Sequence, residues 1–241
     1  MRLTSTKIVR GIMIPAVTLA IALVVGESLR SPFGHTDRLD TTEHVIMGHP
    51  FEVPKAYLIL REQWVPSEMG PGNSILMNGL LPNIDPYSEQ TAQFWEGVDH
   101  YLKFVDFSLK GIIYGTGLWE DYFQAEFLSR CSPGPLDFLN CEDPLSIDFK
   151  SHEILVKIKE EKKIGLVCSR SGAHINEFCE GFFPLIDNIK LSIRFGKKHL
   201  ARAEAIIARV YELVCRFYQP GRRAVTYNHC ETGVYHGKTG T

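Results

Sequence analysis

The most regular alternation of apolar and polar residues in the chain lies between residues 188 and 218. From Ile189 to Phe195 every second residue is apolar, which gives an extended segment one apolar face. From Leu200 to Phe217 the apolar residues recur every three to four positions, which is the period of an amphipathic α-helix. Because a helix with one apolar side needs a sheet to cover, this stretch predicts a strand that leads through Gly196 into a long helix packed on the preceding strands.

The residues just before this helix predict the sheet that it covers. Four short strands are expected, separated by turns, at residues 153–159, 163–168, 178–184 and 189–195. The turn at Glu160-Glu161-Lys162 separates the first two, and its charged run is typical of a solvent-exposed hairpin tip. An antiparallel meander followed by a long helix places the chain in the α+β class.

The first half of the chain predicts a second, less regular group of elements. Pro50 and Pro54 exclude a helix and favour an extended segment that leads into a strand. Residues 66–74 predict a loop and residues 114–150 an irregular segment with a short helix near 119–128, whereas strands are expected at 74–81 and 102–113 and a short helix at 89–98. We therefore expect two α+β subdomains, residues 46–150 and residues 151–241, the second with four strands, the long helix and a tail.

The N-terminus has the pattern of an export signal. Arg2, Lys7 and Arg10 precede an uncharged run at residues 11–26, which is slightly short for a comfortable membrane span. Residues 1–26 are interpreted as a signal peptide or as an N-terminal anchor in the inner membrane, and residues 27–45 as a polar linker. A buried core helix is the third interpretation of the apolar run. Under the first two, the rest of the chain lies in the periplasm.

Export changes the interpretation of the six cysteines, because an even number in an oxidising compartment favours disulfides. Fifteen connectivities are possible. Pairing of sequence neighbours would close three short loops, each worth about 2–3 kcal/mol: Cys131 with Cys141, Cys168 with Cys179, and Cys215 with Cys230. The alternative is a zinc site that uses Cys168, His174 and Cys179, or Cys230, His229 and His236. No CxxC pair is present, although structural zinc prefers that spacing.

Charge and motifs exclude several function classes. The net charge of −2 gives no general attraction to nucleic acid, so no nucleic-acid partner is expected. The sequence contains no GxSxG, HExxH or Walker motif, and no GxGxxG after a strand. We therefore expect no catalytic residues, no metal and no cofactor, and a protein that is not an enzyme. An exported hydrolase that uses scattered histidines and acids is a minor alternative.

Three spaced patterns resemble a family of envelope-resident bacterial proteins, several of which are immunity proteins encoded beside type VI secretion toxins. The first pattern is F-x-V-P-K-x-Y-L at Phe51, Val53, Pro54, Lys55, Tyr57 and Leu58. The second is L-L-P-x-I-x-P at Leu80, Leu81, Pro82, Ile84 and Pro86. The third is I-x-L-S-I-R-F at residues 189–195, followed by L-x-x-A-x-x-I at Leu200, Ala203 and Ile206.

The resemblance implies a non-enzymatic periplasmic binder that occupies the active cleft of a secreted effector toxin. Such a binder needs exposed aromatic or charged anchors. The candidates are aromatic and acidic residues of the turn-rich middle of the chain, namely Trp64, Tyr87, Trp95, Trp119, Glu120 and Asp121. The alternative function is an envelope-anchored structural or secretion-accessory protein without a toxin partner.

Overall fold

The computed structural model describes residues 34–95, 103–111, 123–141, 152–159, 162–170, 177–219 and 230. The chain divides into two compact units, Met1–Gly34 and His35–Thr241, and the description below concerns the second. The predicted signal or anchor, residues 1–26, lies outside the described residues. Among the residues that are described, no helix combines the length and the apolar character needed to span a bilayer.

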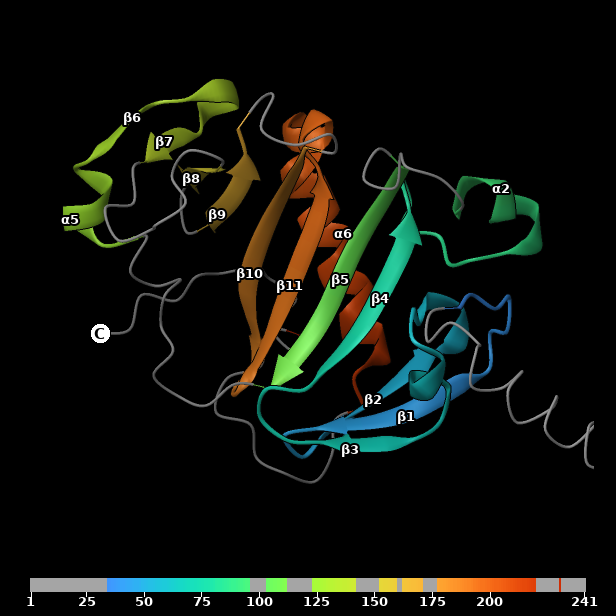
Figure 1. Ribbon diagram of the computed structural model, residues 1–241. Helices are drawn as coiled ribbons and strands as arrows, with labels where there is room; N and C mark the ends of the chain where they lie inside the picture. The colour runs from blue at the N-terminus through green and yellow to red at the C-terminus, as the bar shows by residue number, and fades with distance from the viewer. Residues whose placement is uncertain are drawn as a thin grey trace, which may run out of the picture. The chain divides into compact units, whose positions relative to one another are not determined.

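The second unit is built on an eight-stranded sheet in which all neighbouring strands are antiparallel (Figure 1). The predicted α+β class is confirmed. In spatial order the strands are β4 (Ser74–Leu80), β5 (Phe104–Gly111), β11 (Ile189–Gly196), β10 (Phe178–Ile186), β9 (Lys162–Ser169), β8 (His152–Lys159), β7 (Leu139–Cys141) and β6 (Cys131–Pro133).

The predicted long helix follows β11 directly. It begins as a 3-10 segment, η5 (Lys197–Arg202), and continues as α6 (Ala203–Phe217). Figure 1 shows α6 behind β11, β5 and β4. The apolar face of β11 and the apolar stripe of α6 are both buried, as the alternation and the helical period predict. This face of the sheet and the helix form the main core.

A second sheet of three strands precedes β4 in the chain. It has the order β2 (His49–Pro54), β1 (Thr41–Ile46) and β3 (Ser67–Met69), with β1 and β3 parallel. The predicted linker 27–45 and the predicted loop 66–74 therefore extend too far. The inward side chains at the start of β1 are Thr42 and His44, so this strand has almost no apolar alternation to detect.

Short helical turns connect these strands. The first two, η1 (Lys55–Tyr57) and η2 (Arg61–Trp64), lie between β2 and β3. The others are η3 (Glu89–Thr91), α2 (Ala92–Trp95), α5 (Ala125–Leu128) and η4 (Pro135–Asp137). The short helices predicted at 89–98 and 119–128 are thus present as single turns within the described residues.

The large sheet joins strands from both predicted subdomains. β5 pairs with β11 from Ile189–Gly111 to Phe195–Val105, so strands on either side of the predicted boundary at residue 150 share one sheet. The shortest register between neighbouring strands of this sheet lies elsewhere, between β9 and β10. There only two residue pairs are in register, Cys168 with Cys179 and Val167 with Glu180.

Three disulfides link the cysteines as sequence neighbours, Cys131–Cys141, Cys168–Cys179 and Cys215–Cys230, and no cysteine is free. The first two join directly opposite residues of neighbouring strands. Disulfides of this number are typical of an oxidising compartment. The thiolates that the zinc alternative requires are therefore not available, and His174, His229 and His236 lie outside the described residues.

Candidate functional site

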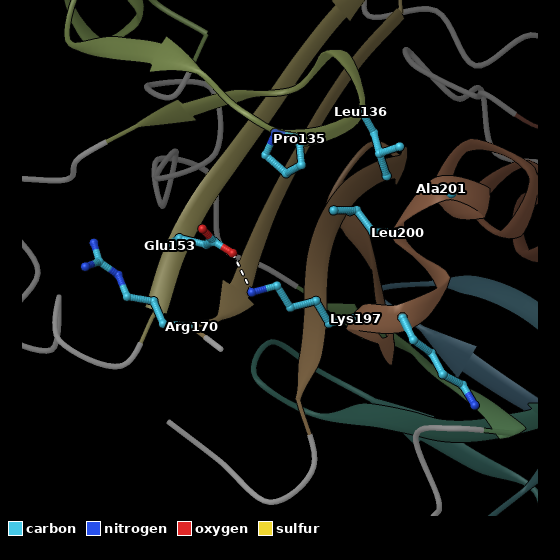
Figure 2. Close-up of a pocket in the computed structure, with 8 residues that line it drawn as sticks. Pro135, Leu136, Glu153, Arg170, Lys197, Leu200 and Ala201 are labelled. Atoms are coloured by element: carbon cyan, nitrogen blue, oxygen red, sulfur yellow. Dashed lines mark ion pairs between the residues drawn. The ribbon is translucent and has the colours of Figure 1, made fainter. Parts of the chain in front are cut away.

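A groove lies between the turn that follows β6 and the start of the long helix. Its larger part has a volume of about 560 Å³ (Figure 2). Pro135 and Leu136 form one wall, and Leu200 and Ala201 form the other. A smaller part of about 220 Å³ adjoins it and shares Leu136, Leu200 and Ala201. We refer to both parts together as the groove.

The β8 strand supplies the charged side of the groove. Alternate residues of a strand point to the same side, so Glu153 and Lys157 flank the buried Leu155 and face the helix start. Glu153 binds Lys197 of η5 with 2.6 Å between Oε1 and Nζ, and Lys157 binds Glu204 of α6 at 2.8 Å. These two ion pairs join β8 to the first residue of η5 and to the first turn of α6.

Lys197 connects its own segment, η5, to the strands β8 and β9. Its Nζ also donates a hydrogen bond of 2.7 Å to the carbonyl oxygen of Ser169 at the end of β9. The Lys197 and Glu153 side chains are each about 16 % exposed, so water screens their ion pair less than it screens a surface pair. The helix start is therefore held at a defined distance from β8 and β9.

The turn Gly134–Phe138 presents an apolar side chain at the rim of the groove. Leu136 is 51 % exposed, whereas Phe138 is buried and anchors the turn in the core. Leu136 and Asp137 both have positive φ, 55° and 63°, which is costly for residues other than glycine. A backbone of this kind persists only where the surrounding contacts hold it.

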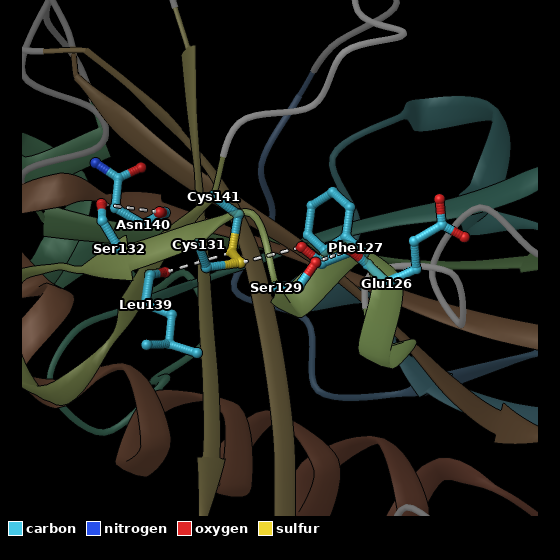
Figure 3. Close-up of a disulfide and its surroundings, with 8 residues drawn as sticks. All are labelled: Glu126, Phe127, Ser129, Cys131, Ser132, Leu139, Asn140 and Cys141. Atoms are coloured by element: carbon cyan, nitrogen blue, oxygen red, sulfur yellow. Dashed lines mark hydrogen bonds between the residues drawn. A yellow bond between two sulfur atoms is a disulfide. The ribbon is translucent and has the colours of Figure 1, made fainter.

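Several contacts hold this turn. The Gly134 N–H donates to the carbonyl oxygen of Phe138 at 2.8 Å, and a Cβ at position 134 would lie equally close to that oxygen. Lys157 Nζ lies 5.3 Å from the centre of the Phe138 ring and 3.5 Å from the carbonyl oxygen of Leu136. At the base of the turn, the Cys131–Cys141 disulfide joins β6 to β7 (Figure 3). The exposed Leu136 is thus presented on a rigid support.

Basic side chains outnumber acids in the larger part of the groove, where Arg170, Lys197 and Lys198 accompany Glu153. Lys197 is paired with Glu153, as described above. Arg170 donates from Nε to the carbonyl oxygen of His152 at 2.9 Å, and its two terminal nitrogens make no bond to the described residues. Arg170 lies beside Glu153, on the far side of the ion pair from Leu136 (Figure 2).

The aromatic anchors expected from the sequence lie elsewhere in the fold. Trp95 is only 8 % exposed and packs against Phe104, with ring centres 4.3 Å apart. Tyr87 is half-buried in the same cluster, stacked on His35. Trp64 is half-buried against the main core. The structure does not bring these three side chains together into one exposed patch, and Trp119, Glu120 and Asp121 lie outside the described residues.

The sequence analysis did not identify any residue of the groove as part of a site. One weak signal was available, because Glu153 and Lys157 have opposite charges on the apolar side of a predicted strand, where a fully buried face would have none. Leu136 carried no signal, since a single leucine in a Pro/Gly-containing loop is common.

Three titratable groups elsewhere in the fold have shifted pKa values. Burial lowers the pKa of His44 in β1, and the backbone of Gln63 opposes this shift. Burial raises the pKa of Tyr57 to about 12. Hydrogen bonds from Lys55 and then Arg38 lower the pKa of Asp40. Among the described residues, no group of three or more His, Cys, Asp or Glu side chains could hold a metal ion.

The groove therefore combines apolar walls, a rigid exposed leucine and charged side chains at its edge. Its lining contains no histidine and no thiol. Protein–protein interfaces likewise combine an apolar core with a polar rim.

Comparison with known proteins identifies a related fold. No family model matches the chain, and no curated protein matches it. An immunity protein of the Stenotrophomonas maltophilia type IV secretion system has a similar structure, with a TM-score of 0.50 and 13 % identity over 79 % of this chain and 98 % of that one. The iron-regulated outer membrane lipoprotein FrpD of Neisseria meningitidis also matches, with a TM-score of 0.48 and 14 % identity over 78 % and 96 %. The first likeness shows a shared fold.

Proposed function

We propose that this protein is an immunity protein of the bacterial periplasm that binds a secreted toxin and blocks its active site. The observation that carries the proposal is the likeness in fold to an immunity protein, which covers 98 % of that protein's chain. The sequence resemblance described above supports the same function independently. Three disulfides and the N-terminal export pattern agree with a periplasmic site of action.

The route by which the toxin arrives is the finer part of the proposal. The sequence resemblance is to proteins encoded beside type VI toxins, whereas the structural neighbour belongs to a type IV system. We propose a type VI effector as the partner. One fold can host unrelated functions, so the identity of the toxin has to come from the partner itself.

We further propose that neutralisation is stoichiometric binding rather than catalysis. The groove lacks the paired nucleophile and base that hydrolysis needs, and all six cysteines are in disulfides. A binder protects only while one copy occupies each toxin molecule.

The test is a toxin-protection experiment with the toxin encoded beside this protein. The toxin is exported to the periplasm of a susceptible strain, with and without the full chain, and survival is counted. We expect protection, and a purified complex that contains the two proteins in equal amounts. Loss of viability despite full expression of the chain would contradict the proposal.

Titration of the purified toxin separates binding from catalysis. Inhibition should reach completion near one equivalent of the chain. Complete inhibition by a small fraction of an equivalent would show turnover and would favour the hydrolase alternative. Protection that requires a type VI donor strain in mixed culture would support the finer part of the proposal.

A further inference from the structure

We infer that the groove binds a toxin segment that carries both an apolar side chain and a carboxylate. The inference rests on the proposed function and names the chemistry of the partner at this site. It follows from the presence of an apolar surface and a basic group in the lining of the same groove, on opposite sides of the Glu153–Lys197 ion pair.

The apolar part of the segment would lie between Leu136 and the helix start. Leu136 is half-exposed on a turn whose backbone is held in the left-handed region by its surroundings. Leu200 and Ala201 face it across the groove (Figure 2). Leu200 is already buried, so a partner side chain inserted here removes from water the apolar surface of Leu136 and of the exposed Ala201. The turn that carries Leu136 is held by its surroundings and loses little conformational entropy on binding.

The carboxylate would meet Arg170. The terminal nitrogens of this guanidinium make no bond to the described residues, while its Nε bond to the His152 carbonyl oxygen limits its movement. A guanidinium with two parallel N–H groups free binds a carboxylate in a two-point contact, which a lysine cannot do. The basic excess of the larger part of the groove favours an acid over a base at this position.

The same geometry argues against a basic segment. In the larger part of the groove the acidic lining residue is Glu153, and Lys197 already neutralises it at 2.6 Å. A lysine or arginine of a partner would therefore meet Arg170 there without a second carboxylate among the lining residues of that part, whereas Asp137 and Glu204 line the smaller part. Charge alone does not define the site, because the walls offer apolar surface that a simple polyanion cannot use.

The experiment uses three labelled octapeptides and the purified, oxidised full chain. One peptide alternates leucine with glutamate, the second replaces glutamate by lysine, and the third replaces leucine by serine. Binding is measured by fluorescence anisotropy. We expect the leucine–glutamate peptide to bind at least about tenfold more tightly than either of the others. Equal binding of the serine–glutamate peptide would show that only charge is recognised and would overturn the inference.

Two single variants test the basic contact and the apolar contact of the groove separately, each with a matched control. Arg170→Glu should shift the preference from the leucine–glutamate to the leucine–lysine peptide. Its control is Arg216→Glu, which makes the same charge change at an exposed site near the other end of α6. Leu136→Asn should weaken binding about tenfold, whereas Leu39→Asn, at another exposed leucine, should not. Variants and controls that bind alike would overturn the inference.

The toxin experiment separates this inference from the proposed function. If the chain protects against the toxin and Arg170→Glu and Leu136→Asn protect less than their controls, the inference is supported. If the chain protects and all four variants protect equally, the groove is not the binding site and only the inference fails. If the chain binds the leucine–glutamate peptide as expected but no toxin is neutralised, the proposed function fails.

Discussion

At the scale of single residues, Leu136 combines two properties that rarely occur together. It has a backbone conformation that leucine disfavours, and it exposes half of its side chain to water. Neither property stabilises the fold. Packing within the folded protein therefore does not explain a leucine at this position, whereas contact with another molecule would.

Replacing Leu136 by asparagine should therefore stabilise the protein. Asparagine tolerates the left-handed region, and little buried apolar area is lost, so we expect a gain of roughly 0.5–1 kcal/mol in the free energy of unfolding. Urea denaturation monitored by circular dichroism measures the change. Leu39→Asn is the control and should leave stability nearly unchanged. A clear loss of stability in Leu136→Asn would show that this leucine contributes to packing.

A second residue, His44, should make the stability depend on pH. Burial lowers its pKa below the ordinary value of 6.5, so the unfolded chain accepts a proton that the folded chain resists. The contribution of neutral His44 is complete above pH 6.5 and declines as the pH falls below that value. The thermal unfolding midpoint should decrease when the pH is lowered from 7.5 to 5.5. This decrease should be smaller in His44→Gln. His199→Gln, at a partly exposed position, should behave like the wild type.

At the scale of elements, the free edge of β4 is closed by a side chain. Gln63 is buried, and its amide nitrogen donates to the Ser74 carbonyl oxygen at 2.9 Å while its amide oxygen accepts from the Leu76 N–H at 3.1 Å. A glutamine amide thus takes the place of a peptide group from a neighbouring strand. A strand edge without such partners is a site at which sheets of different molecules associate.

Replacement of Gln63 by leucine should remove both bonds and leave two polar backbone groups without partners. We expect a loss of about 2–3 kcal/mol in the free energy of unfolding, measured in urea, and more aggregation on heating. Gln93→Leu, at an exposed position in α2, is the matched control and should change little. An unchanged Gln63→Leu variant would mean that water satisfies this edge.

The elements that could be predicted from the sequence are those with one apolar and one polar face. The strands β10 and β11 and the helix α6 have regular alternation or a helical period, and β8 and β9 have short apolar runs between turns. β1 could not be found, since its inward residues include Thr42 and His44. Pattern alone also could not show that β5 pairs with β11, because the two strands are far apart in the chain.

The groove could not be predicted because its parts meet only in the folded chain. Leu136, Glu153 and Leu200 come from three elements with no shared sequence pattern. The sequence analysis favoured large aromatic residues as anchors, but the fold uses Trp95 to fill its own interior. Size and apolar character alone do not tell an internal packing residue from an exposed anchor.

At the scale of the whole molecule, the β9–β10 junction joins two halves of the large sheet. Hydrogen-bonded register there extends over two residue pairs, one of which is the disulfide pair Cys168 and Cys179. The covalent bond thus supplements a short ladder. The groove crosses this junction, because Glu153 belongs to one half and Lys197 follows the last strand of the other.

Removal of this disulfide should loosen the junction more than the rest of the sheet. For Cys168→Ala with Cys179→Ala we expect a loss of about 3 kcal/mol, together with faster amide hydrogen exchange in β9 and β10 than in β4 and β5. The matched control is Cys131→Ala with Cys141→Ala, which opens a loop of similar length, 10 rather than 11 residues. The control should lose comparable stability without faster exchange at the junction. Equal exchange in both variants would contradict a special role for this bond.

The position of β11 has a consequence for how the chain reaches its native state. This strand lies between β5 and β10, although the ribosome makes it after both of them. Until β11 has been synthesised, the β4–β5 pair and the strands β6 to β10 have no strand that joins them, so the complete sheet cannot form. A polypeptide of this order cannot finish its sheet before residue 196 has been made, which suits a chain that is threaded through a membrane channel and folds on the other side.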